Sequence, residues 1–238
     1  MHLRIKYSKL GKVRFTGHRD VARLWERALR KAEIPVSYSE GFSPRPRVSF
    51  GLALPTGAES IAEYLDLLAP RDLDPAEVLA SVQAALPAGF GVLGVMEIDK
   101  ASPSLQEDVV ACTWEFGLRE ITEPELCEAV EATLAASELP LERSRKGATR
   151  VDDVRPTIDT LTVASSEDGP VLHARLATRP RGMRPGELLE VMFPAVPDTG
   201  ELAGRVLRTT QLIERDGAQR DLFPPDAAVA GHTNAVCA

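Results

Sequence analysis

The stretch that decides the fold is LRIKYSKLGKVRFTGHRDVARLWERALRKAEIP, residues 3–35. Its first half is typical of two short strands around Leu10-Gly11, or of one bulged strand. From His18 onward, apolar residues recur at spacings of three and four, the pattern of a helix with one buried side. Pro35 is expected to end that helix. A strand followed by an amphipathic helix indicates a fold that combines a sheet with packed helices.

The following residues extend this pattern to a complete unit. In residues 36–51, Gly41, Pro44 and Pro46 interrupt two strand-like pieces, so the centre of this segment is expected to be a loop. Residues 62–68 alternate as a strand, residues 75–86 form a second helix with a proline in its first turn, and residues 91–98 form a strand. The order β-α-β-β-α-β predicts a ferredoxin-like unit.

The same order recurs in the second half of the chain. The predicted elements are a strand at 111–119, a helix at 123–137, a strand at 141–147, a strand at 159–165 or 171–178, a helix at 184–193 and a strand at 205–215. We therefore expect an α+β protein of two tandem ferredoxin-like units, residues 1–100 and 109–217, each an antiparallel sheet with helices on one face. Residues 101–108 are a predicted linker, and residues 218–238 are a predicted disordered tail.

Composition narrows the class of protein. No apolar run of the 238-residue chain approaches the roughly 18 residues of a membrane helix, so we expect no membrane span. The first residues do not resemble a signal peptide, which favours a cytoplasmic location. The three cysteines lie far apart, and the four histidines form no HExxH pair, so no metal site and no cofactor are expected.

The charge of the chain is unevenly distributed. Residues 1–60 hold twelve Lys and Arg against five Asp and Glu, whereas residues 61–238 hold sixteen against thirty. Solubility alone does not require a basic segment on an acidic protein. The asymmetry points to an anionic partner for the N-terminal part.

Four arginines of the first helix share one face. Arg19, Arg23, Arg27 and Arg30 stand at i, i+4, i+8 and i+11. They form either a solvated surface or a site for phosphates, to which guanidinium groups donate paired hydrogen bonds. Lys6 and Lys12 precede this helix and extend the candidate anion-binding set.

The loop after the helix adds a second group of candidates. Its residues Phe42, Ser43, Arg45 and Arg47 stand beside two prolines, Pro44 and Pro46, which stiffen the backbone and lower the entropy lost on binding. Phe42 or Tyr38 could stack on an exposed base. The alternative is that Phe42 fills the core and the loop is only a rigid connection.

Two further groups of residues are candidates for a chemical role. His18, with Asp20 two positions on, is a weak candidate for a catalytic pair, although a lone histidine is more often structural. Basic residues concentrate again between 143 and 184, where the segment 146–156 either forms the far edge of an anion-binding track or pairs with Asp152 and Asp153.

The N-terminal residues resemble a known family. The motifs that carry the resemblance are Thr16-Gly17-His18-Arg19-Asp20, Arg23, Arg27-Ala28-Leu29-Arg30, Pro35-Val36-Ser37-Tyr38-Ser39, Gly41-Phe42-Ser43-Pro44, Leu54-Pro55 and Glu63-Tyr64-Leu65-Asp66. They are similar to the radical SAM-linked proteins, also described as domain-of-unknown-function family 2344. The match is dense over residues 1–70 and thins out beyond.

This resemblance implies a partner more than a reaction. Members of the family are encoded beside, or fused to, a radical SAM protein. The chain lacks the CxxxCxxC motif of a radical SAM enzyme, so it is not that enzyme itself. It carries Ser43 and Arg45 where the family commonly has Asn and His, which favours an electrostatic role there over a metal or acid-base one.

Three functions are compatible with these observations. The preferred one is a non-catalytic accessory protein that binds an anionic substrate, a structured RNA, and presents it to a radical SAM partner. The second is an endoribonuclease-like enzyme that uses His18, by analogy of fold alone. The third is a protein-docking adaptor whose basic surface binds an acidic partner without nucleic acid.

Overall fold

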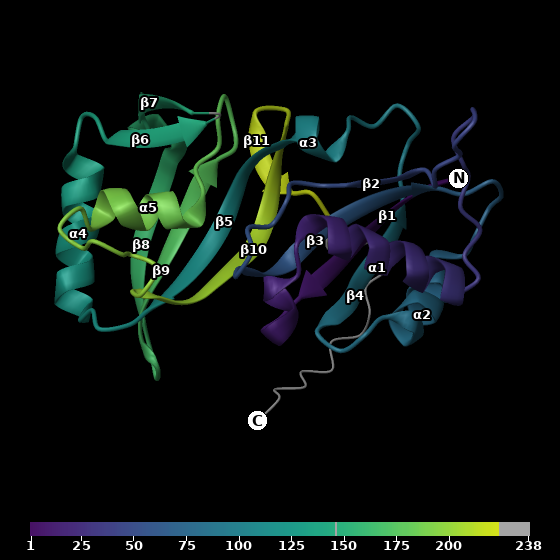
Figure 1. The fold of residues 1–238 in the computed structure, drawn as a ribbon, viewed down its shortest axis with the longest axis horizontal. Helices are drawn as coiled ribbons and strands as arrows, with labels where there is room; N and C mark the ends of the chain where they lie inside the picture. The colour runs from purple at the N-terminus through teal and green to yellow at the C-terminus, as the bar shows by residue number, and fades with distance from the viewer. Residues whose placement is uncertain (146, 224–238) are drawn as a thin grey trace. The chain divides into compact units, whose positions relative to one another are not determined.

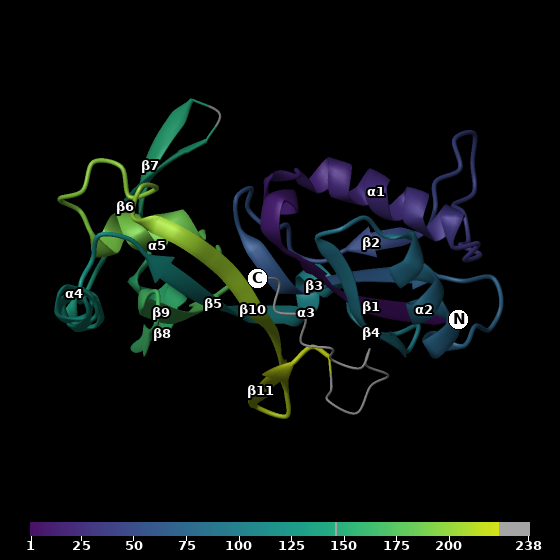
Figure 2. The ribbon, with the colours of Figure 1, turned by 90° about the horizontal axis from the view of Figure 1, so that it is seen from below.

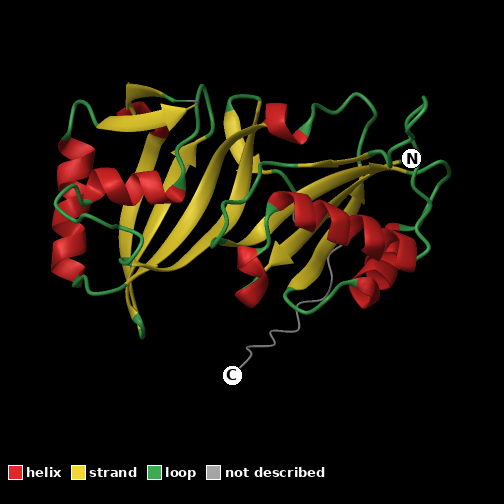
Figure 3. Cartoon of the chain, viewed as in Figure 1, coloured by secondary structure: helices red, strands yellow, loops and turns green. Residues whose placement is uncertain are grey.

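The computed structural model describes residues 1–145 and 147–223, and it has an α+β fold divided into two compact units (Figures 1 and 3). Unit 1 comprises residues 1–108 with Phe223, and unit 2 comprises residues 109–222. Most of the predicted tail, residues 224–238, lies outside the described residues. No helix within the described residues is long and apolar enough to cross a membrane.

Unit 1 contains the order β-α-β-β-α-β that the sequence predicts. Its elements are β1 (His2–Lys9), the 3-10 turn η1 (Gly11–Phe15), α1 (His18–Lys31), β2 (Val48–Phe50), β3 (Glu59–Leu68), α2 (Pro75–Ala85), β4 (Phe90–Glu97) and the short α3 (Leu105–Asp108). The strands lie in the order β4-β1-β3-β2, and each of these pairs is antiparallel.

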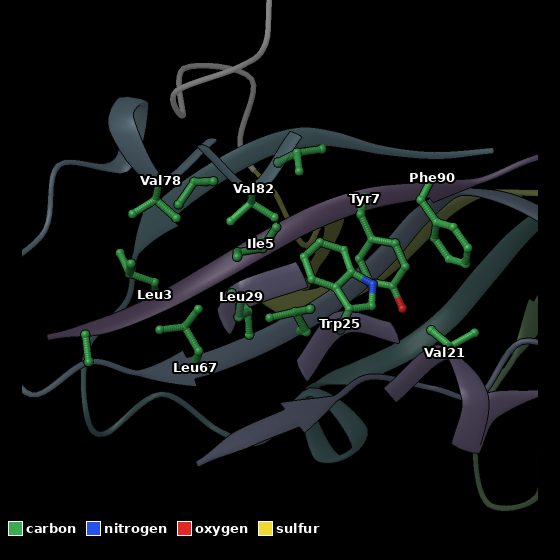
Figure 4. Packing of buried hydrophobic residues seen from close by; sticks show 14 residues of the cluster. Leu3, Ile5, Tyr7, Val21, Trp25, Leu29, Leu67, Val78, Val82 and Phe90 are labelled. Atoms are coloured by element: carbon green, nitrogen blue, oxygen red, sulfur yellow. The ribbon is translucent and has the colours of Figure 1, made fainter. Parts of the chain in front are cut away.

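The core of unit 1 lies between the strands and the two long helices. Leu3, Ile5 and Tyr7 alternate along β1, which places them on one face of the sheet. They join one buried cluster with residues of both α1 and α2, so the two helices cover the same face (Figures 2 and 4). Trp25 of α1 is fully buried there, and its ring centroid lies 4.7 Å from that of Tyr7.

Unit 2 is built around four antiparallel strands of its own, with α4 and α5. Its elements are β5 (Val109–Leu118), α4 (Glu123–Ala135), β6 (Pro140–Arg145), β7 (Ala148–Asp153), the 3-10 turn η2 (Arg155–Thr157), β8 (Ile158–Ser166), β9 (Gly169–Ala177), α5 (Pro185–Met192), β10 (Ala203–Arg215) and β11 (Ala218–Asp221). The order is β10-β5-β9-β8, and β11 pairs with β10.

The sequence interpretation of unit 2 is wrong at one strand. The segment at 141–147 was expected in the main sheet, but it pairs with β7 in a separate two-stranded ribbon. Both candidates for the next strand are present instead, as β8 and β9. The reason is composition: β7 exposes nearly all of its residues, so it has no apolar face to bury in a packed sheet.

Two boundary predictions also need correction. Residues 105–108, assigned to the linker, form α3, in which Leu105 and Asp108 are buried. Leu105 packs against Gly51, where an added Cβ would lie 3.6 Å from a Leu105 methyl. Residues 218–221, assigned to the disordered tail, form β11, because Asp216 and Gly217 make a turn that returns the chain to β10.

Candidate anion-binding surface

The exposed side of α1 carries an arginine stripe, defined as Arg19, Arg23, Arg27 and Arg30. At 3.6 residues per turn these positions fall within an arc of about 80° and extend over about 16 Å of helix. All four side chains are exposed. The stripe therefore is a continuous basic ridge on unit 1.

The opposite side of α1 anchors the ridge. Val21, Trp25, Ala28 and Leu29 are buried, and Trp25 and Leu29 recur at the i, i+4 spacing of one helix face. Because these side chains lock the helix against the sheet, the arginines cannot turn inward. The stripe is thus held on a rigid element.

The arginines of the stripe have few anionic partners. Arg23 contacts Asp20 at 3.4 Å, and both side chains are largely exposed. Within residues 1–145 and 147–223, Arg19, Arg27 and Arg30 form no ion pair. Like charges spaced i, i+4 repel by about 0.2–0.5 kcal/mol per pair, so a bound anion would relieve this repulsion.

Beside α1, residues 37–47 form a narrow ribbon. The Ser39 amide donates to the Arg45 carbonyl at 2.8 Å, the Arg45 amide donates to the Ser39 hydroxyl at 3.0 Å, and the Arg47 amide donates to the Ser37 carbonyl at 2.7 Å. Gly41 has a φ of +119° at the tip, a backbone conformation that favours glycine. The predicted loop is thus a closed, hydrogen-bonded structure.

The tip of the ribbon presents its side chains to solvent. Phe42 is fully exposed, and Ser43, Arg45 and Arg47 are exposed as well. The alternative in which Phe42 fills the core is therefore wrong. An aromatic ring held in water with two guanidinium groups nearby in sequence is suited to contact a ligand that has both planar rings and negative charges.

A small cavity connects α1 with the base of the ribbon. It has a volume of about 90 Å³. Its walls are Glu26, Leu29 and Arg30 from α1, Ile34 and Val36 from the following segment, Tyr38 and Pro46 from the ribbon, and Val48 from β2. Arg30 belongs to both the stripe and the cavity, so the two features are continuous.

The two predicted lysines lie apart from each other. Lys12 is exposed in η1, shortly before α1. Lys6 points to the face of the sheet opposite the helices, since it alternates with Ile5 and Tyr7. Its Nζ lies 5.9 Å from the ring centroids of Tyr64 and Phe223. The structure therefore does not bring Lys6 together with the arginine stripe.

The candidate catalytic pair is not assembled. His18 is exposed, and its ring stands edge-on to Phe50, with centroids 5.8 Å apart. Asp20 pairs with Arg23 instead. Within the described residues, His18 makes no hydrogen bond to a side chain that could orient or charge it. This geometry lacks the base and orienting group of an acid-base site.

Sequence reasoning missed Phe15. This residue ends η1 just before α1, and 61% of its surface is exposed. The Arg14 guanidinium lies 4.8 Å from its ring centroid. Lys9, which is buried, fixes the turn because its Nζ donates to the carbonyls of Arg14 and Thr16 at 3.1 and 2.8 Å. The signal in the sequence was an aromatic residue between two basic segments.

The arginines of unit 2 differ from those of α1. Arg143 donates to both Glu187 oxygens, at 3.1 and 2.7 Å, and contacts Asp152 at 3.4 Å. Asp152 also pairs with Arg150 and Arg181. Of the two interpretations of this segment, pairing with carboxylates is the one that the structure contains.

Comparison with known proteins gives a family but no activity. A family model described as "Uncharacterized protein conserved in bacteria (DUF2344)" matches residues 2–185. Among curated proteins, no sequence matches the chain. A similar solved chain comes from the "Crystal Structure of a Cbf5-Nop10-Gar1 Complex", with a TM-score of 0.45 and 12% identity over 88% of this chain and 48% of that chain. The chain spans about half the length of that solved chain.

Proposed function

We propose that this chain, which belongs to the DUF2344 family, is a non-catalytic protein that binds a structured RNA through the arginine stripe and the tip of the 37–47 ribbon. The observation that carries the proposal is a rigid row of four exposed arginines, three of them without an ion pair in the described part of the chain. Phosphate oxygens match guanidinium geometry. Phe42 adds a ring that can stack on an unpaired base.

The fold supports this role. The strand orders β4-β1-β3-β2 and β10-β5-β9-β8 have the same pattern, so we class both units as ferredoxin-like, with the β6–β7 ribbon inserted in the second. In unit 1 the helices cover one sheet face and leave the outer side of α1 free of packing. Basic residues gather on that side.

The partner in this proposal is a radical SAM protein in the cytoplasm, to which the chain presents its RNA. This step rests on the resemblance of the N-terminal motifs. A protein without its own catalytic site needs a partner for any reaction on the bound RNA, and the exposed His18 has no orienting group among the described residues.

Salt-dependent binding tests the proposal directly. Fluorescence anisotropy with an RNA stem-loop whose single-stranded loop contacts the arginines should give a plot of log K against log[salt] with a slope near −3, for about four neutralised phosphates. Raising salt from about 50 to 200 mM should then weaken binding about 50-fold. Arg23→Ala and Arg27→Ala should each flatten the slope. The matched control is Arg71→Ala, which changes an exposed arginine in the loop between β3 and α2, outside the stripe, and should leave the slope unchanged.

Two results would replace the proposal with one of its rivals. Cleavage of the stem-loop by the wild-type protein, lost in His18→Ala, would establish the endoribonuclease. Absence of RNA binding together with capture of an acidic protein through the same arginines would establish the docking adaptor. Intact RNA and arginine-dependent binding would support the accessory role.

A further inference from the structure

The cavity between α1 and the 37–47 ribbon has the chemistry of a base-binding site. We propose that it binds one unpaired guanine base of the RNA whose phosphates lie on the arginine stripe, an inference that rests on the proposed function. The cavity has a volume of about 90 Å³, room for several waters at the roughly 10–15 Å³ that one water needs. A planar ring that enters it displaces this water from an apolar wall.

The walls favour a flat, partly apolar ligand. Leu29, Ile34, Val36 and Val48 supply aliphatic surface. Tyr38 borders the cavity with 57% of its surface exposed, so its ring is available for stacking. Stacking of bases on aromatic side chains is a general source of affinity in single-strand binding. A phosphate alone would gain nothing from these residues.

The position of the cavity favours a base attached to a bound backbone. Arg30 lies in the stripe and also lines the cavity. A strand whose phosphates contact Arg23 and Arg27 would therefore reach the cavity at the next turn of the helix. An isolated metabolite would not use the remaining arginines.

The two charged residues of the cavity select the base. Glu26 and Arg30 are separated by four positions, yet within residues 1–145 and 147–223 neither forms an ion pair. An ionised carboxylate accepts two hydrogen bonds, and a guanidinium donates several. Guanine has two adjacent donors, N1–H and the N2 amino group, together with the acceptors O6 and N7.

The other bases fit this pair less well. Adenine and cytosine place an acceptor nitrogen beside their amino group, so this nitrogen would face the carboxylate oxygen of Glu26. Uracil has a single N–H between two carbonyl groups. A site built to bond both guanine donors therefore rejects the analogues that lack them.

Glu26 has no other evident role on this surface. At 3.6 residues per turn it lies about 20° outside the arc of the arginine stripe, where its negative charge weakens the attraction for phosphate. Removing it should strengthen binding to any RNA, so affinity alone cannot test the inference. The ratio of the affinities for two RNAs that differ in one base can test it, because the electrostatic contribution is the same for both RNAs and cancels.

The test uses short oligouridines that carry one central guanosine, adenosine, cytidine or inosine. Wild-type protein should bind the guanosine oligomer at least about tenfold more tightly than the all-uridine oligomer, a typical gain for one bidentate contact. Inosine, which lacks only the N2 amino group, should lose most of this preference. Glu26→Gln should abolish the preference, and Tyr38→Ala should weaken it while Tyr38→Phe retains it.

Matched variants separate a base pocket from general effects. Glu97→Gln makes the same charge change at an exposed position of β4 and should leave the preference intact. Arg23→Ala should weaken all oligomers by a similar factor without changing their ratio. Melting curves by circular dichroism should be the same for these exposed-site variants, which confirms that each one folds.

The outcomes distinguish the two proposals. If the wild-type protein binds neither the stem-loop nor the oligomers, the proposed function fails. If it binds RNA with a normal salt slope but without base preference, or with a preference that Glu26→Gln leaves unchanged, the guanine pocket is overturned and RNA binding stands. If Tyr38→Ala spares RNA binding but releases a partner protein, the cavity is a protein contact and the inference is wrong.

Discussion

Arginine has two different environments in this chain. In the stripe of α1 the guanidinium groups face solvent, and three have no anionic partner within the described residues. In unit 2, Arg143 is only 8% exposed and contacts two carboxylates. Burial lowers its pKa, but the hydrogen bonds and charges of Glu187 and Asp152 outweigh burial and raise the pKa above its ordinary value. Arg143 is thus a structural cation.

Removing this cation should destabilise unit 2. Arg143→Ala leaves the Glu187 and Asp152 carboxylates without their shared partner, and we expect a loss of about 2–3 kcal/mol in the free energy of unfolding. This is below the largest values for dry ion pairs because both carboxylates retain 14% exposure. Urea denaturation would measure it. A change as small as that of an exposed site, such as Arg23→Ala, would contradict the prediction.

The end of α1 contains one strained residue. Glu33 has a φ of +55°. Its amide donates to the Arg30 carbonyl at 3.1 Å, and the amide of Ile34 donates to the Leu29 carbonyl at 3.0 Å. This is the Schellman arrangement, in which glycine is the usual residue. The helix therefore ends through its own backbone before it reaches Pro35.

Glycine at this position should stabilise the protein. The left-handed conformation costs a residue with a side chain about 1–2 kcal/mol, partly offset by the greater freedom of glycine in the unfolded chain. Glu33→Gly should thus raise the free energy of unfolding by about 0.5–1 kcal/mol, measured by thermal or urea denaturation. Glu33→Ala keeps the strain and serves as the control. Equal effects of both variants would show that loss of the charge, not relief of strain, is responsible.

At the scale of elements, α1 separates stability from binding. Trp25 is fully buried, so Trp25→Ala should cost about 3–5 kcal/mol. Arg27→Ala, two residues on and exposed, should change stability by less than about 0.5 kcal/mol while it weakens RNA binding. Melting curves and binding isotherms of the two variants would check both claims. Loss of stability in Arg27→Ala would place this arginine in the packing of unit 1.

Elements with a strong local pattern could be predicted from the sequence. Both α1, with its apolar spacing, and α2, with its Asp74 cap followed by Pro75, are determined by residues close together in the sequence. In the structure Asp74 accepts a hydrogen bond from the Ala76 amide at 2.8 Å. The β6–β7 ribbon could not be predicted in this way. Its strands alternate weakly, and their pairing with each other outside the main sheet is visible only in the folded structure.

The candidate site was predictable only in part. Helical spacing alone places the four arginines on one side, because they belong to one regular element. The walls of the cavity come from residues 26–48 and meet only when α1 and the ribbon have folded together. No local sequence pattern therefore predicts the cavity. Lys6 was assigned to the site by its nearness in sequence, but the alternation of β1 turns it to the other sheet face.

At the scale of the whole molecule, each unit contains one of the two tryptophans. Trp25 is buried in unit 1 and Trp114 in unit 2. A Trp25→Phe variant therefore has a fluorescence that reports unit 2 alone. This allows the stability of one unit to be followed within the full chain.

Unit 2 should lose stability in acid. Backbone hydrogen bonds from Leu139 and Arg155 lower the pKa of Asp153 below its ordinary 3.8, and the bonds from Thr122 lower that of Glu125 below 4.5. A carboxylate whose pKa is lower in the folded than in the unfolded state stabilises the protein at pH values above its ordinary pKa. This contribution disappears as the pH falls through the pKa of the folded state. The urea concentration at the midpoint of unfolding, followed by Trp114 fluorescence, should therefore decrease as the pH falls below about 4.5.

Asp153→Asn isolates one of the two carboxylates. This variant should be less stable than its parent at neutral pH, and the difference should shrink as the pH falls, because the parent also loses the charge. A constant difference from neutral pH to about pH 3 would mean that ionisation of Asp153 does not contribute to the stability of unit 2.

The two faces of α1 also determine what a genetic screen would recover. Alleles altered at Val21, Trp25 or Leu29 should be temperature-sensitive and rescued by any suppressor that stabilises the fold. Alleles altered in the arginine stripe should accumulate normal amounts of protein at every temperature and resist such suppressors. Plotted along residues 18–31, the two classes of allele would alternate with the 3.6-residue period of the helix.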